Sequence, residues 1–276
     1  PSHNMIIYSA ASGIGVPIGD LFLAGVVPGL VTAAILMVVT WLVAVKRGYA
    51  AGSFPGWRAF ARAVLVAIPG LMAAVIIMGG ILSGIFTATE SSAIAVIYTI
   101  LVGAFVYLSL GWSRFVEASM QSVKVTAMVL LIIGAATAFG YALAVLEAPS
   151  QLAELITSIT RNPLLVLLII NVMLLVLGTF MDMSPLIVIT TPILLPVVME
   201  VGVDPVHFGI IMMLNLGIGL VTPPVGSVLF VGAAVGGLPV EKAVKTIWPF
   251  YLALIGALLL ITYIPALSLS LPGLFK

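Results

Sequence analysis

The sequence predicts an all-α polytopic membrane protein, and its composition and its apolar runs lead to that fold class. Of the 276 residues, 63% are hydrophobic and only 7% are charged, and the mean hydropathy is +1.35. Soluble domains carry roughly a quarter charged residues. A helix needs about 20 apolar residues to cross a hydrocarbon layer, and such runs recur along the chain. They are Leu21–Val45, Ala63–Phe86, Ser91–Leu110, Val123–Leu146, Pro163–Met181, Phe208–Val221 and Thr246–Leu271.

The composition also excludes several other classes of protein. The runs are continuous, whereas the strands of a membrane β-barrel alternate in hydrophobicity over about ten residues. A net charge of +1 provides no basic surface for nucleic acid, and a chain without cysteine forms no disulfide or thiolate metal site. His3 and His207 lack partners at ligand spacing, so no transition metal is expected. No catalytic triad, Walker loop or dinucleotide fingerprint occurs, which predicts a protein that is not an enzyme and holds no cofactor.

Basic residues gather on one side of the predicted membrane. When the sides alternate from Leu21–Val45 onward, one side holds eight of the ten basic residues, and the other holds only Arg161 and Lys276. The positive-inside rule makes the first side cytoplasmic. Its basic residues are Lys46, Arg47, Arg58, Arg62, Arg114, Lys124, Lys242 and Lys245.

The segment at about 162–200 is predicted to be a re-entrant hairpin. The charge distribution places Pro163 and Glu200 on the same outer side, so the chain must turn within the membrane near Phe180–Pro185. At this turn Asp182, small residues and a proline interrupt an apolar region. Such backbone is tolerated at membrane depth only where protein buries it or where it lines a wet cavity. An ordinary extracellular loop at Asp182 is the alternative.

Two segments of the chain resemble each other. Residues 1–13 align with 224–236, and after a one-residue slip residues 14–18 align with 236–240; a spanning segment follows each copy. In the predicted topology the two copies run in opposite directions. Inverted repeats with helices broken at mid-membrane build the central binding sites of many secondary transporters. Chance similarity between two Gly/Ala-rich membrane segments is the alternative.

The repeat divides the chain into three parts. Residues 1–45 are expected to form the end of the first inverted repeat, a broken helix followed by a span. Residues 46–62 form a cytoplasmic loop between the repeats, although their basic and aromatic residues also suit an interfacial segment. Residues 63–276 form the second repeat. It contains spans, the hairpin at 162–200, a broken helix at about 206–237 and a last span at about 245–271.

The segment Gly217–Ser227 is predicted to break a membrane helix. Pro223 and Pro224 remove two backbone donors, so carbonyl groups of the preceding turn lose their helical partners. A desolvated sodium ion, a hard cation that prefers oxygen ligands, would suit such carbonyls, and Thr222 would add its hydroxyl group. A simple proline kink satisfied by neighbouring helices is the alternative.

Asp182 is the only acidic residue that the topology places at membrane depth. A charge there is costly unless it is paired, hydrated or coordinated. Its expected roles are hydrogen bonding at the tip of the hairpin or stabilisation of an ion. The alternative is a water-exposed carboxylate that caps a helix.

Three segments of the chain have distinctive patterns: Ile18–Gly29, Gly84–Glu90 and Gly209–Phe230, the last of which contains a Thr-Pro-Pro-Val-Gly core. They resemble signatures of one known family, the large membrane subunit of tripartite ATP-independent periplasmic (TRAP) transporters. The likeness covers the whole chain, although Ala88 replaces a proline that is usual in the family.

The resemblance implies an elevator-type secondary transporter in the bacterial inner membrane, with Na⁺ as the coupling ion. It also implies an imported organic acid, such as a C4-dicarboxylate or sialic acid. Its expected partners are a small membrane subunit (Q), a periplasmic substrate-binding protein (P) and membrane lipid. The chain begins at Pro1 without an initiator Met, and the resemblance implies that the first hairpin precedes Pro1.

The resemblance also carries the expected site onto particular positions. The hairpin tip and the helix break together would form one sodium site, near Thr222 and Gly226, and part of the substrate site. The residues are Gly178, Asp182, Met183, Ser184, Thr222, Pro223, Pro224, Gly226 and Ser227, with Ser2 and Asn4 in the broken helix of the first repeat.

Three other functions stay open. The first is a sodium/carboxylate carrier that needs no binding protein. An intramembrane enzyme is the second, and it would need a catalytic pair at depth, where only Asp182 is evident. The third is a passive channel or scaffold, which would not accumulate solute against a gradient.

Overall fold

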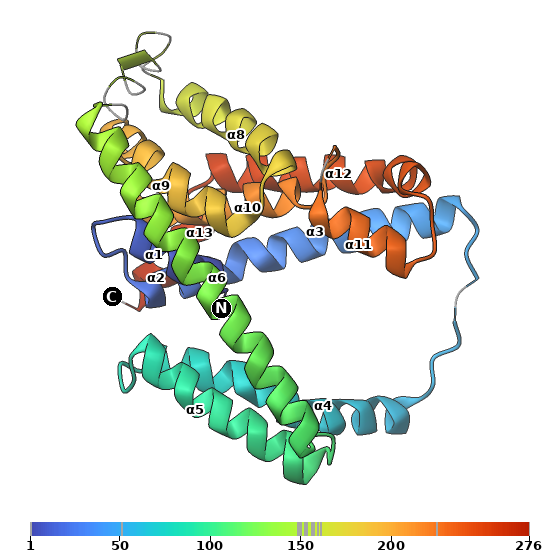
Figure 1. Cartoon of the computed structure of the whole chain (residues 1–276). Coiled ribbons are helices and arrows are strands. Elements are labelled where there is room, and N and C mark those ends of the chain that lie inside the picture. Colours follow the sequence, from blue (N-terminus) through green and yellow to red (C-terminus); the bar gives the residue numbers. More distant parts are fainter. Residues whose placement is uncertain are drawn as a thin grey trace. The chain divides into compact units, whose positions relative to one another are not determined.

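The computed structural model describes residues 2–275 apart from 51, 148–150, 152, 153, 156, 157, 159, 161 and 225 (Figure 1). Every regular element in this part of the chain is a helix. Seven of these helices are long and apolar enough to cross a membrane. The predicted all-α polytopic fold is therefore confirmed.

The helices fall into two compact units, and the smaller comprises residues 47–129. Its helices α4 and α5 lie antiparallel, because the Tyr98 hydroxyl of α5 donates to the carbonyl of Pro69 in α4 at 2.8 Å, while Gly80 near the other end of α4 meets Ser91 at the start of α5. A capping box of Thr87 and Glu90 begins α5. The elements are α4 (Trp57–Leu82), α5 (Ala88–Leu101), the π-helical turn η1 (Val102–Val106) and the first part of α6 (Trp112–Val145).

The predicted loop at 46–62 is wrong in its second half, because α4 already begins at Trp57. Pro55 and Gly56, which has φ +93°, stop the helix from extending further back. From Trp57 onward the chain has residues that form helix readily. Arg58 and Arg62 are polar, but they do not interrupt the helix. The first turns of α4 are therefore a helical extension of the span.

The larger unit comprises residues 2–46 and 130–275, and α10 lies at its centre (Figure 1). Phe208, Ile211, Met212 and Leu216 of this helix are fully buried. Gly209 lets Tyr8 pack closely, since an added Cβ would lie 2.7 Å from its ring. The helices are α1 (His3–Ala11), α2 (Ile18–Ala24), α3 (Val26–Lys46), α8 (Pro163–Phe180), α9 (Met183–Glu200), α10 (Pro205–Gly219), α11 (Ser227–Val235), α12 (Val240–Tyr263) and α13 (Ala266–Leu274).

The predicted last span at 245–271 is present as α12 but ends at Tyr263, because the structure divides the apolar run into α12 and α13. Ile264 leaves the helical conformation, with φ −122° and ψ 81°. Pro265 causes this, since it disfavours helical backbone in the residue before it and lacks an amide donor. The apolar run continues across the break, so hydropathy alone could not reveal it.

The two copies of the predicted repeat have matching local structure. Helices α1 and α11 are both nine residues long. Each is followed by glycine in the left-handed region, Gly13 with φ +68° and Gly237 with φ +61°. Pro17 and Pro239 then precede the helices α2 and α12. The connections differ in length, with residues 12–17 between α1 and α2 and residues 236–239 between α11 and α12, but the equal helix lengths and the matching prolines support the predicted repeat.

Candidate functional site

The predicted hairpin is formed by α8 and α9, which are joined at Met181 and Asp182. Asp182 is exposed, and its carboxylate accepts the backbone N–H of Met183 at 2.8 Å as the N-cap of α9. The sequence suggested two roles for Asp182: a hydrogen bond at the hairpin tip, or an exposed carboxylate that caps a helix. This contact agrees with both. Asp182 therefore fixes the start of α9.

The hairpin tip lies beside the middle of α12. At the other end of the hairpin, the Tyr263 hydroxyl donates to the Leu164 carbonyl at 3.2 Å. Near the tip, Thr179 lines a cavity together with Trp248 and Tyr251. Helix α12 continues from there to Val240, a further distance of about 16 Å at 1.5 Å per residue. A hairpin that ends halfway along a spanning helix supports the re-entrant interpretation.

The predicted break is present between α10 and α11 and contains the cis peptide bond Pro223–Pro224. The carbonyl of Gly219 accepts the Thr222 N–H at 2.9 Å, and that of Leu220 accepts the Val228 N–H at 3.1 Å. The expectation that these freed carbonyls lack a protein partner is thus wrong. A tight turn supplies protein donors instead, although each carbonyl oxygen keeps a second lone pair.

A side chain from α12 also supports the break. The Tyr251 hydroxyl donates to the carbonyl of Val221. Tyr251 is 2% exposed, whereas Val221 is half-buried. The Thr222 hydroxyl donates back to the Ile218 carbonyl at 2.7 Å. The conformation of the break is therefore held by hydrogen bonds from both sides.

Tyr251→Phe should weaken the break without disturbing the helix that carries it, because it removes one hydroxyl and leaves the ring. We expect a loss of about 1 kcal/mol in unfolding free energy, the typical net contribution of one hydrogen bond. Tyr263→Phe is the matched control, since its hydroxyl also donates to a carbonyl but lies at an exposed position. Thermal unfolding of both variants checks this, and equal effects would contradict a special role for Tyr251.

One flank of the hairpin tip contacts the break. The backbone N–H of Gly226 donates to the Thr179 carbonyl at 3.3 Å. Gly178 and Gly219 bring α8 and α10 together, because a Cβ on Gly219 would lie 2.6–2.7 Å from backbone atoms of Gly178. Gly226 itself has φ +26°. These glycines allow the backbone of the hairpin to meet the backbone of the break directly.

The opposite flank of the tip contacts the first repeat. The buried Asn4 of α1 donates its amide to the sulfur of Met183 at 3.1 Å and accepts the Ser184 hydroxyl at 2.9 Å. Ser2 caps α1 by accepting the Asn4 N–H at 3.3 Å. The structure thus brings together Asn4, Met183 and Ser184, which are far apart in the sequence.

Three helix N-termini converge on the hairpin tip as a result. Helices α1, α9 and α11 begin at His3, Met183 and Ser227, and the contacts of Asn4 and Gly226 bring these starts to the same turn. The first N–H groups of a helix lack helical acceptors and carry partial positive charge. The C-terminal ends of α8 and α10 lie at the same place and present partial negative charge. The arrangement therefore offers backbone N–H groups with partial positive charge and backbone carbonyls with partial negative charge, and it contains no ionised basic residue.

The remaining predicted residues lie at the edge of this arrangement. Pro223 lines the cavity beside the tip, whereas Pro224 and Ser227 are exposed. The sequence reasoning missed Thr179, Gly219 and Tyr251. A glycine at the end of an apolar run gives a weak signal of close packing, but nothing in the sequence indicates that Tyr251 would reach the break.

The cavity beside the tip has a volume of about 310 Å³ and mostly apolar walls. Its hydroxyl groups are already used as donors: that of Thr179 donates to the Val176 carbonyl at 2.8 Å, that of Thr222 to the Ile218 carbonyl in α10, and that of Tyr251 to the Val221 carbonyl in the break. The cavity separates the tip from α12. It offers space for apolar groups and few polar contacts.

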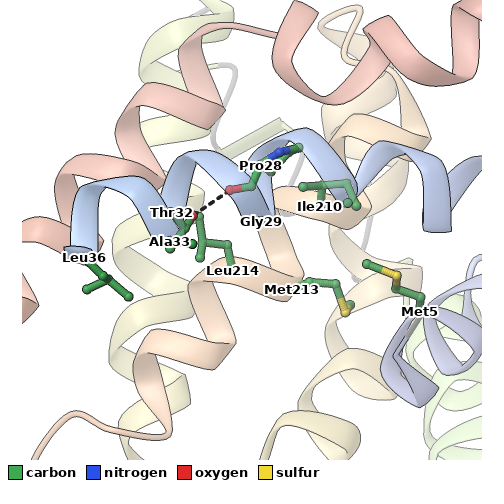
Figure 2. Close-up of a pocket in the computed structure, with 10 residues that line it drawn as sticks. Met5, Pro28, Gly29, Thr32, Ala33, Leu36, Ile210, Met213 and Leu214 are labelled. Atoms are coloured by element: carbon green, nitrogen blue, oxygen red, sulfur yellow. Dashed lines mark hydrogen bonds between the residues drawn. The ribbon is translucent and has the colours of Figure 1, made fainter. Parts of the chain in front are cut away.

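A second cavity, of about 390 Å³, lies between α3 and α10 (Figure 2). Thr32 is the only hydroxyl-bearing residue in its lining, and that hydroxyl donates to the Pro28 carbonyl at 2.8 Å. Met5, Met213 and Leu214 provide much of the remaining wall, as Figure 2 shows. Such a lining cannot satisfy a charged or strongly polar ligand. This cavity is therefore not the candidate site.

Comparison with known proteins identifies the family. Residues 1–267 match the family model described as "Tripartite ATP-independent periplasmic transporter, DctM component". A C4-dicarboxylate TRAP transporter large permease protein of Pseudomonas aeruginosa is 42% identical over 99% of this chain and 64% of its own length. A sialic acid TRAP transporter large permease protein of Vibrio cholerae is 39% identical over 100% of this chain and 64% of its own length.

A third relative is named for a different substrate. An isethionate TRAP transporter permease protein of Oleidesulfovibrio alaskensis is 40% identical over 99% of this chain and 43% of its own length. The chain thus spans less than two thirds of the length of each of these relatives. With the seven candidate spans, the match makes it a multi-pass protein of the bacterial inner membrane. The chain belongs to the DctM family of TRAP transporter large permease subunits.

Proposed function

We propose that this chain is the substrate-translocating part of a sodium-coupled, binding-protein-dependent importer of organic acids. The observation that carries the proposal is the convergence of three helix N-termini on the hairpin tip, between the two copies of the repeat. Transporters with inverted repeats place anionic substrate groups at such half-helix starts. The relatives are named for a C4-dicarboxylate, sialic acid and isethionate, all of which are organic anions.

The carboxylate of the substrate would bind to the backbone N–H groups at the starts of α1, α9 and α11. Asn4 and Ser184 would orient it, because both combine donor and acceptor atoms at this place. Neutral donors favour an anion without forming a fixed ion pair, so the substrate can leave again. The elevator motion implied by the family resemblance is part of the proposal.

Sodium would bind at the carbonyl-rich side of the tip, near Thr222 and Gly226. The residues fit a hard cation because the available atoms are neutral oxygens: the hydroxyl and carbonyl of Thr222 and the carbonyl of Thr179. A Cβ on Gly226 would lie 2.7 Å from the Thr222 carbonyl oxygen, so the glycine keeps the space next to that oxygen open. Bound sodium would supply the positive charge that strengthens binding of the acid.

Thr222→Ala should weaken the sodium dependence of uptake more than it lowers the protein level, because it removes one candidate ligand. We expect the sodium concentration for half-maximal uptake to rise at least fivefold. Thr246→Ala is the matched control, since the Thr246 hydroxyl also donates to the carbonyl four residues earlier, at 2.9 Å. If Thr222→Ala lowers uptake only as much as it lowers the protein level, the threonine has a folding role instead.

The proposed function is tested by uptake into proteoliposomes that contain the full-length protein, its small membrane subunit and its binding protein. Labelled succinate, sialic acid and isethionate are the probes, with and without an inward sodium gradient. We expect accumulation of at least one acid only when both sodium and the binding protein are present. Uptake that ignores sodium and the binding protein would contradict the proposal and favour a channel or a simpler carrier.

A further inference from the structure

We propose that the first turns of α4 bind the headgroup of an anionic phospholipid through Arg58 and Arg62. This site lies in the smaller unit, apart from the hairpin tip, and it does not depend on which solute the protein transports. Three features support the site: the length of α4, the two different faces of its first turns, and the lack of protein partners for Arg58 and Arg62 among the described residues.

The length of α4 places its first turns in the headgroup region. The helix has 26 residues and is about 39 Å long, whereas the hydrocarbon layer is about 30 Å thick. The part from Ala63 to Leu82 carries no charged residue and accounts for about 30 Å. When this part fills the hydrocarbon layer, Trp57–Arg62 lies at the level of the lipid headgroups.

The first turns of α4 have two chemically different faces. Arg58 and Arg62 are four residues apart and thus lie on one face of the helix. Trp57 and Phe60 lie on the opposite face, where their rings meet edge to face at 5.9 Å. Phe54 extends this aromatic group, with its ring 5.4 Å from that of Trp57. Aromatic residues favour the boundary between headgroups and hydrocarbon, so they hold the arginines at the required depth.

The two arginines have no protein partner among the residues that the structure describes. Both side chains are exposed, and neither forms a hydrogen bond or an ion pair there. No acidic residue occurs between Arg47 and Arg62. Two guanidinium groups on one face, without an ion pair in the described part of the chain, match the charge and geometry of a lipid phosphate, which an arginine binds with two parallel hydrogen bonds.

The neighbouring helix end keeps this segment at a defined place within the unit. The Tyr107 hydroxyl, just after η1, donates to the carbonyl of Val66 at 2.8 Å, one turn beyond Arg62. The beginning of α4 is thus braced by the end of the α5–η1 segment. The arginines are presented on a supported helix rather than on a free loop, which lowers the entropy lost when a headgroup binds.

The test uses the purified full-length protein and phosphatidylglycerol, with phosphatidylcholine as the uncharged comparison. Arg58→Gln/Arg62→Gln is the test variant. Lys242→Gln/Lys245→Gln is the control, because these two exposed lysines also lie in the first turns of a spanning helix on the predicted cytoplasmic side. Native mass spectrometry measures bound phosphatidylglycerol, and thermal unfolding measures the stabilisation that this lipid adds.

We expect the test variant to bind phosphatidylglycerol roughly twentyfold more weakly at low salt, since each basic residue near an anionic surface contributes about a fivefold factor. The control should keep most of the binding and of the thermal shift. Equal losses in both variants, or no loss in either, would overturn the proposal and leave only the general attraction of a basic surface. If the glutamine variant cannot be purified, Arg58→Lys/Arg62→Lys should retain a lipid-dependent shift that high salt removes, and a salt-insensitive shift would overturn the proposal.

Discussion

Gly219→Ala is expected to cause a large functional loss, although it adds only one methyl group. The new Cβ would lie 2.6–2.7 Å from the carbonyl carbon, Cα and carbonyl oxygen of Gly178. Backbone atoms cannot rotate away as a side chain can, so α8 must move from α10. Overpacking of this kind costs about 1–3 kcal/mol or more. Because the displaced helix carries the hairpin tip, uptake should fall at least tenfold.

Gly217→Ala provides the matched control in the same helix. A Cβ at Gly217 would meet no atom within 4 Å. Alanine also favours helix over glycine by up to about 1 kcal/mol, so this variant should be as stable as the wild type or slightly more so. Thermal unfolding and uptake of the two variants are the measurements. Similar behaviour would show that the Gly178–Gly219 contact does not position the hairpin.

Asn171→Leu is expected to cause the second large effect, this time on stability. Asn171 of α8 bridges two other helices at full burial: its amide donates to the Thr262 hydroxyl at 3.0 Å, and its side-chain oxygen accepts the Asn215 amide at 2.8 Å. Leucine removes both bonds and leaves buried polar groups that water cannot reach. We expect a loss of about 2–6 kcal/mol in unfolding free energy, from two groups at about 1–3 kcal/mol each.

Thr191→Val is the control, because it also removes a buried polar group but breaks no bridge between helices. Thr191 is also fully buried, but its hydroxyl makes only a 3.5 Å contact with the sulfur of Met212, a weak acceptor. Valine has nearly the same shape, so the expected loss is below about 1 kcal/mol. Chemical or thermal unfolding in detergent compares the variants. Equal destabilisation would mean that the bridge formed by Asn171 adds nothing to ordinary packing.

Much of the fold follows from the sequence because the membrane imposes simple rules. Apolar runs of sufficient length must be helical, since backbone groups in hydrocarbon need internal hydrogen bonds. The tandem prolines Pro223 and Pro224 predict a break wherever they occur in a span. The single Pro265 had the same effect, but a lone proline in a membrane helix often causes only a kink. The division of the last span was therefore missed.

The site was predictable in its parts but not in its contacts. The sequence indicated the hairpin turn, the break and the repeat, yet the pairing of Asn4 with Met183 and Ser184 depends on how α1 packs against α9. The role of Tyr251 depends on tertiary packing in the same way. The reasoning about the break also assumed that freed carbonyls stay without donors, whereas a tight turn pairs those of Gly219 and Leu220 within the protein.

The central claim is that the hairpin tip, held between the two repeats, is where sodium and the organic acid bind. Because the chain has no cysteine, the Met181→Cys variant carries a single thiol within this segment, at an exposed position of the hairpin turn that is not a proposed ligand. The most direct measurement is the rate at which a maleimide labels that thiol in the reconstituted protein. The account predicts slower labelling in sodium than in potassium, and still slower labelling when a transported acid is added. A rate that is the same in sodium, in potassium and with each acid would contradict the account.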